Sequence, residues 1–282
     1  MGVNHIMLQS IARRAGRAFF CLAALGSLFA TTSANAQGDL LVAPTRVILN
    51  GGRGTEVILS NIGSEEATYR ISLELRRMTP AGDLVDVTED NANDKERAAL
   101  AMIRYAPRRI TLPPGQPQSV RIAARPGADL PDGEYRAHLV FRGIPKPAPA
   151  PAPDDPAKGI SIALIPIYGV SIPIIVREGN IEAQVALSDP HLAKSPKGEA
   201  LVFALDRSGL ASTYGEVRVT KDGKQIYFAR GVAVYPEIAR RTVTLPLTPD
   251  QAAQMTGQVH IEYREMPEAG GDVMASLDTV LG

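Results

Sequence analysis

Short runs in which apolar and polar residues alternate cover most of the sequence. Val, Ile, Tyr and Leu occupy one face of each run and Arg, Glu or Ser the other, which is typical of half-buried antiparallel strands. The runs comprise residues 40–49, 56–61, 69–75, 119–124 and 135–141, and later residues 182–187, 200–205, 216–220, 241–247 and 258–263. Two series of closely spaced strands without long helices predict an all-β protein of two immunoglobulin-like β-sandwich domains.

Clusters of Gly, Pro, Asn and Asp, the residues that favour turns, separate these runs. The Asp222-Gly223 pair predicts a two-residue hairpin. The Gly-rich residues 51–54 stand between two alternating runs, so a hairpin turn is favoured there over an anion-binding nest. Residues 90–102 are the one stretch that reads as helical, and they are polar enough to form a surface loop instead.

One apolar run is much longer than the others. Residues 160–176 contain no charge over seventeen positions, whereas a typical strand has about 5–6 residues. A membrane-spanning helix needs about 20 apolar residues, and Pro166, Gly169 and Pro173 would interrupt a helix of this length. The run therefore predicts a long last strand, residues 160–177, which follows a Pro-rich loop at residues 145–158 and completes the sheet of the first domain.

The N-terminus reads as a cleaved secretory signal. Three arginines precede an apolar stretch and a small-residue site that ends at Ala36, so we expect a signal peptide at residues 1–36 and export to the periplasm. The single cysteine, Cys21, lies within that signal, so the exported chain has no disulfide. It would keep 27 basic and 30 acidic residues, a formal net charge of −3, which gives no basic excess for binding nucleic acid. The expected domains are residues 37–177 and 178–282.

Catalytic and metal-binding motifs are missing from the sequence. It has no nucleophile elbow, no HisGluXaaXaaHis and no Walker loop. The three histidines beyond the signal, His138, His191 and His260, are scattered singly, as strand-face residues are. We therefore expect neither enzymatic activity nor a cofactor or metal site.

Several short motifs, taken in order, resemble the periplasmic pilus-assembly chaperones of the chaperone/usher pathway, the PapD-like family. They lie in the first domain, at residues 43–49, 59–61, 119–122, 130–135, 143–145 and 172–177. Over the second domain the likeness is one of strand pattern only. The resemblance implies two immunoglobulin-like domains joined at an angle, with pilin-type subunits and an outer-membrane usher as partners, and no embedding in the membrane.

The family's mechanism assigns a role to the long strand. Pilin subunits lack their last strand, and the chaperone inserts its own strand into the open groove, so that backbone bonds complete the sheet and alternate side chains fill pockets. By this resemblance, Ile160, Ile162 and Leu164 would fill the client's pockets, and Ile167 would continue the row beyond Pro166. The competing interpretation is that these residues complete the chaperone's own core.

The resemblance also assigns roles to charged residues. Arg46 matches one of two basic residues that hold the client's terminal carboxylate, while the position of the second, normally a lysine, is Pro173. Glu134 and Arg177 match an ion-pair network that orients the two domains, with a third acid expected from Glu262 or Glu265.

Two other functions fit the same composition. A structural or adhesive component of a surface fibre would also be immunoglobulin-like, but it would need a donor strand at the mature N-terminus, where residues 37–41 are too short. A periplasmic enzyme or glycan-binding module is disfavoured by the missing motifs and by the absence of Trp. A self-capping dimer of the idle chaperone stays an open alternative.

Overall fold

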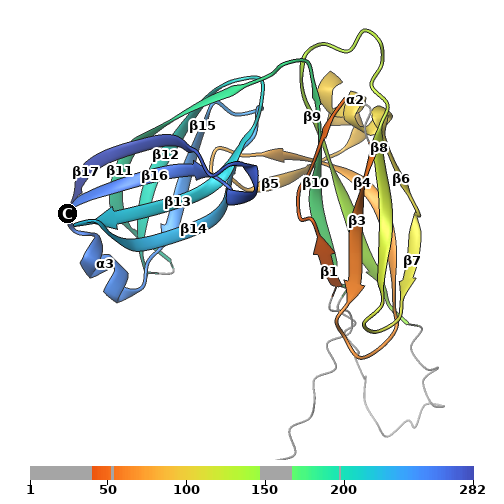
Figure 1. Ribbon diagram of the computed structural model, residues 1–282, viewed down its shortest axis with the longest axis horizontal. Helices are drawn as coiled ribbons and strands as arrows, with labels where there is room; N and C mark the ends of the chain where they lie inside the picture. The colour runs from red at the N-terminus through yellow and green to blue at the C-terminus, as the bar shows by residue number, and fades with distance from the viewer. Residues whose placement is uncertain (1–39, 52–53, 147–166, 197) are drawn as a thin grey trace, which may run out of the picture. The chain divides into compact units, whose positions relative to one another are not determined.

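The computed structural model describes residues 40–51, 54–146, 167–196 and 198–282. The expected signal peptide and most of the Pro-rich loop lie outside the described residues. Residues 38–282 form one compact unit. Four β-sheets, packed in pairs around two hydrophobic cores, account for most of this unit, which confirms the prediction of an all-β protein with two sandwiches (Figure 1).

The first sandwich consists of a four-stranded and a six-stranded sheet. The smaller sheet runs in the order β1 (Leu40–Ala43), β3 (Gly54–Asn61), β8 (Pro117–Ala124) and β6 (Ile103–Ala106). The larger runs in the order β2 (Val47–Asn50), β10 (Gly169–Glu178), β9 (Gly133–Ile144), β4 (Ala67–Met78) and β5 (Leu84–Val87), with β7 (Arg109–Leu112) also paired to β4. Leu59 from the first sheet and Leu139, Phe141 and Ile174 from the second are fully buried in the shared core.

The strand predicted over residues 40–49 is divided between the two sheets. β1 pairs antiparallel with β3, whereas β2 pairs parallel with β10 in the other sheet. Arg46 lies between the two segments. Because β2 and β3 belong to different sheets, they do not form a hairpin with each other, and the hairpin predicted at residues 51–54 is wrong.

The second sandwich pairs a three-stranded with a four-stranded sheet. The first runs in the order β11 (Ala183–Ser195), β12 (Gly198–Gly209) and β15 (Arg240–Pro246). The second runs in the order β14 (Lys224–Val234), β13 (Thr213–Lys221), β16 (Gly257–Glu265) and β17 (Val273–Leu281). The division of the chain at residues 177/178 stays a prediction.

The hairpin predicted from Asp222-Gly223 is confirmed. Lys221 and Lys224 face each other across β13 and β14, which leaves a two-residue loop. Asp222 and Gly223 have φ angles of 50° and 75°, the left-handed values that a type I′ turn requires at both positions.

In the described part of the chain, two α-helices accompany the sheets. The helical reading of residues 90–102 is confirmed by η2 (Glu89–Asn91) and α2 (Asp94–Met102), and α2 begins with a capping box between Asn93 and Glu96. The second helix, α3 (Pro249–Met255), was not predicted, although Thr248 and Gln251 form the same box around it.

We expect Thr248→Ala to lower the free energy of unfolding by about 1 kcal/mol, because the Thr248 hydroxyl accepts a hydrogen bond from the Gln251 N–H and no other side chain would replace it. Urea denaturation followed by far-UV circular dichroism measures the change. Thr256→Ala, at the other end of α3, is the matched control and should stay within about 0.5 kcal/mol of wild type. Equal effects of the two variants would contradict the cap.

Candidate functional site

β10 carries the described part of the long apolar run. Ile160, Ile162 and Leu164 lie outside the described residues, while Ile167 and Tyr168 are each 58% exposed just before the strand begins. From Ile174 onward β10 pairs with both β2 and β9, but residues 169–173 pair, among the described strands, with β9 alone. Within the described ranges, the N-terminal half of β10 therefore has an open edge, whose backbone groups are suited to pairing with another strand.

Pro173 lies in this open part of the strand. It faces His138 across the ladder with β9, and it has no described partner on its other side. Proline is tolerated at such an edge because it has no N–H to contribute to a second ladder. At the position where the family that the sequence resembles has a lysine, Pro173 therefore adds neither a charge nor a backbone donor.

A buried carboxylate joins the two sandwiches. Glu134, at the start of β9, has a side chain that is 1% exposed. Its Oε2 accepts hydrogen bonds from the backbone N–H of Ser212 at 2.9 Å, from the Ser212 hydroxyl at 2.8 Å and from Arg177 Nε at 3.3 Å. Arg177, from β10, also donates to the Ser212 carbonyl at 3.3 Å. Both charged residues of the first sandwich thus bind the loop between β12 and β13.

The acid expected from the second sandwich is absent from this cluster. Glu262 forms ion pairs with His260 and Arg264, and Glu265 forms none with a described residue. Ser212 takes the place of the expected acid, because its hydroxyl and backbone satisfy Glu134 and Arg177 together. The expectation of Glu262 or Glu265 as the partner of Arg177 is therefore wrong for the described residues.

Arg46 extends the same cluster. Its Nη2 donates to the Ser212 hydroxyl at 2.8 Å and its Nη1 to the Tyr235 hydroxyl at 3.1 Å. The guanidinium lies 4.7 Å from the ring centre of Tyr214 and 5.4 Å from that of Tyr235, which are cation–π distances. Arg46 is therefore held by the second sandwich and is not a free surface arginine.

A second polar cluster between the sandwiches was missed in the sequence. Arg136 of β9 forms an ion pair with Glu237 at 2.5 Å, and Glu237 also accepts a hydrogen bond from the backbone N–H of Met78 at 2.7 Å. The Arg136 guanidinium lies 3.5 Å from the ring centre of Tyr235. A small apolar cluster, which includes Met78, Ile175 and Tyr235, packs beside it. No sequence motif marks residues 235–237, which follow β14.

The loops that present these partners are held by a buried arginine. Arg207, at the end of β12, donates to the carbonyls of Gly209 and Ala211 on one loop and of Pro236 and Ile238 on the other. Burial lowers the pKa of its guanidinium from the usual value. Because one side chain binds both loops, Arg207 fixes the positions of Ser212 and of Tyr235 and Glu237 relative to each other.

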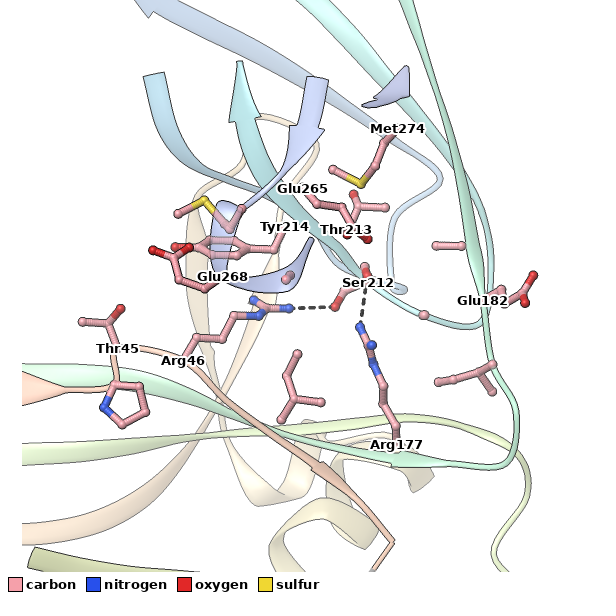
Figure 2. Close-up of a pocket in the computed structure, with 17 residues that line it drawn as sticks. Thr45, Arg46, Arg177, Glu182, Ser212, Thr213, Tyr214, Glu265, Glu268 and Met274 are labelled. Atoms are coloured by element: carbon pink, nitrogen blue, oxygen red, sulfur yellow. Dashed lines mark hydrogen bonds between the residues drawn. The ribbon is translucent and has the colours of Figure 1, made fainter. Parts of the chain in front are cut away.

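A pocket of about 810 Å³ opens beside Arg46 and Arg177 (Figure 2). Its polar and aromatic lining includes Ser212, Thr213 and Tyr214 from the second sandwich. Figure 2 shows that Arg46, from the segment between β1 and β2, and Arg177, from β10, both point toward Ser212. The predicted residues Arg46, Glu134 and Arg177 are thus brought together, and Ile167 lies at the other end of β10.

No described helix is long and apolar enough to cross a membrane. Within the described ranges, no three His, Cys, Asp or Glu side chains are grouped so that they could hold a metal ion.

Comparison with known proteins gave structural neighbours only. No family model and no curated protein matches the sequence. Among solved structures, the E. coli chaperone DraB is 15% identical with a TM-score of 0.45, and the match covers 87% of this chain and 97% of DraB. A chain of the Acinetobacter baumannii CsuC-CsuE chaperone-tip adhesion subunit complex is 13% identical with a TM-score of 0.46, covering 86% and 99%. The class 5 fimbriae chaperone CfaA is 13% identical with a TM-score of 0.43, covering 86% and 99%. Each of these structures is of a chaperone or of a complex that contains one.

Proposed function

We propose that this protein is a periplasmic chaperone that stabilises pilin-type subunits by adding a strand to their incomplete fold and delivers them to an outer-membrane usher. The observation that carries the proposal is the open edge of β10 at residues 169–173, which is preceded by exposed Ile167 and Tyr168 and by the rest of an uncharged run. An unpaired edge next to a long apolar segment is suited to strand addition.

In this proposal the strand supplies both affinity and specificity. Main-chain hydrogen bonds pair the donor strand with the client's open sheet, and Ile160, Ile162 and Leu164 fill the client's pockets, with Ile167 at the end of the row. The free energy comes from completing the client's fold, so that no nucleotide or other cofactor is needed. Residues 37–177 form the chaperone domain, and residues 178–282 form the second domain.

Arg46 is proposed to bind the client's terminal carboxylate. A guanidinium has five N–H donors, and the hydrogen bonds of Arg46 to Tyr235 and Ser212 use two of them. A bond from the remaining donors to a carboxylate would be of the stronger, charge-assisted kind. Pro173 adds no second cation, so Arg46 would work next to Arg177, whose main task is to hold Glu134 and Ser212.

Co-expression of the full chain with the fibre subunits encoded beside its gene tests the proposal. The expected result is a soluble 1:1 complex of chaperone and subunit after export. Subunits that stay soluble and fold without the chaperone would contradict it.

We expect Ile162→Asp and Leu164→Asp each to abolish subunit capture, because a carboxylate would be forced into an apolar pocket of the client. Pull-down of the subunit with the tagged chaperone measures capture, and an unchanged melting temperature shows that the chaperone itself is folded. Arg46→Ala should weaken capture without abolishing it. Normal capture by both Asp variants would contradict the donor-strand assignment, and normal capture by Arg46→Ala would contradict the carboxylate anchor.

A further inference from the structure

The pocket beside Arg46 is lined by opposite charges from the two sandwiches. The first sandwich contributes the basic groups, Arg46 and Arg177. The second contributes three carboxylates, Glu182 before β11, Glu265 at the end of β16 and Glu268 in η3 (Pro267–Ala269). Figure 2 shows both sets of side chains around one cavity. A ligand of this pocket therefore meets both signs of charge.

The acidic side chains are not compensated within the protein. None of Glu182, Glu265 and Glu268 forms an ion pair with a described residue, although two arginines line the same pocket. Arg177 is already paired with the buried Glu134. Arg46 is therefore the one pocket cation without a carboxylate partner among the described residues, against three free carboxylates.

A carboxylate bound in this pocket would be both attracted and repelled by the charges that line it. Arg46 would attract it, but Glu182, Glu265 and Glu268 would repel it, because charges that are closer than the screening length of about 8 Å at physiological salt interact. A ligand that carries a cation a short distance from its carboxylate gains from both sets of groups. The pocket also offers Tyr214, Met266 and Met274, apolar surface along which the aliphatic part of a lysine or arginine side chain can lie.

We propose that the carboxylates of Glu182, Glu265 and Glu268 select client subunits that carry a Lys or Arg side chain next to the terminal carboxylate. The inference rests on the proposed function, since it assumes that Arg46 binds a client's C-terminus. It adds a specificity that the arginine alone does not provide. The ligand class is a peptide C-terminus that is zwitterionic over its last residues.

Four acetylated tetrapeptides test this inference on the full exported chain. Three have a free carboxylate and end in Lys-Tyr, norleucine-Tyr or Glu-Tyr, and the fourth is the Lys-Tyr peptide as a C-terminal amide. Titration followed by amide NMR shifts of Thr213 and Tyr214 reports binding at the pocket. We expect the Lys-Tyr acid to bind about three- to fivefold more tightly than the norleucine peptide, the range for a partly exposed ion pair, and the Glu-Tyr peptide to bind most weakly of the three acids.

Two variants test whether the pocket carboxylates cause the preference for Lys and whether Arg46 binds the terminal carboxylate. In the triple variant Glu182→Gln/Glu265→Gln/Glu268→Gln, the Lys and norleucine peptides should bind with nearly equal affinity, whereas in Arg46→Ala all free acids should weaken together. Equal binding of the Lys and norleucine acids to wild type, no binding of the Lys-Tyr acid, or a Lys preference that persists in the triple variant overturns the inference. Equal binding of the Lys-Tyr acid and amide overturns instead the carboxylate anchor of the proposed function.

Discussion

Glu134→Ala should lower the free energy of unfolding by about 3 kcal/mol, one of the two largest effects that we expect from a single substitution. The Glu134 carboxylate accepts three hydrogen bonds, two from Ser212 and one from Arg177, and its side chain is buried. Its removal leaves the Ser212 N–H without its acceptor and the Arg177 guanidinium with one bond to the Ser212 carbonyl. Because these partners come from both sandwiches, the loss should also loosen their contact.

Urea denaturation followed by tyrosine fluorescence measures the change, since the chain has no Trp and eight Tyr. Glu56→Ala is the matched control: Glu56 pairs with Arg121 at 3.1 Å on the surface, and its loss should cost less than about 1 kcal/mol. A double-mutant cycle with Ser212→Ala isolates the coupling between the two sandwiches. A Glu134→Ala variant as stable as Glu56→Ala would mean that the cluster does not hold the sandwiches together.

The strands of both sandwiches could be predicted where one face is buried and the other is exposed to solvent. Alternation of this kind identified β9 and β13, and the Asp222-Gly223 pair identified the hairpin between β13 and β14. Alternation does not say which sheet a strand joins, so β1 and β2 were read as one strand. The strands β5, β6 and β7 were missed because they have only four residues each, and the edge strand β17 was missed because Leu281 is its one buried residue.

The candidate site could be predicted only for residues on strands that the motifs mark. Arg46, Glu134 and Arg177 were singled out by the resemblance, and the structure brings them to one cluster around Ser212. Ser212 itself lies in a loop between β12 and β13, and no alternation or motif indicates that it would meet β9. Contacts between the sandwiches depend on the conformations of two loops of the second sandwich. Arg207 holds both loops, because its buried side chain donates hydrogen bonds to the carbonyls of Ala211 and Pro236.

His138 makes the stability of the protein sensitive to acid. It lies on β9 opposite Glu74 of β4 and Pro173 of β10 and is 1% exposed, and neither ring nitrogen has a hydrogen-bond partner among the described residues. Burial, with the positive charges of Arg136, Arg76 and Arg46 as further causes, lowers its pKa to about 3. Glu74 is paired with Arg76 and Arg142 and so does not offset these charges.

The sign of the effect follows from where the proton binds. Between about pH 6.5, the usual histidine value, and pH 3, His138 takes up a proton in the unfolded chain but not in the folded one. Stability therefore falls as the pH falls through this window, by about 3 kcal/mol at about pH 4.5 from this residue alone. The loss is absent above about pH 7, where His138 is neutral in both states.

We expect His138→Leu to remove this acid sensitivity. Leucine has a similar volume and no polar atoms to bury without partners, so the variant should be at least as stable as wild type at neutral pH. Urea denaturation at about pH 7 and pH 4.5 should show a decline in stability that is smaller than that of wild type by about 3 kcal/mol. His260→Gln is the control with the opposite sign, because its hydrogen bond to Asp278 raises the pKa of His260, and this contribution is present in acid and lost as the pH rises. Equal declines for His138→Leu and wild type would show that other carboxyl and histidine groups, and not this buried ring, set the acid limit of the fold.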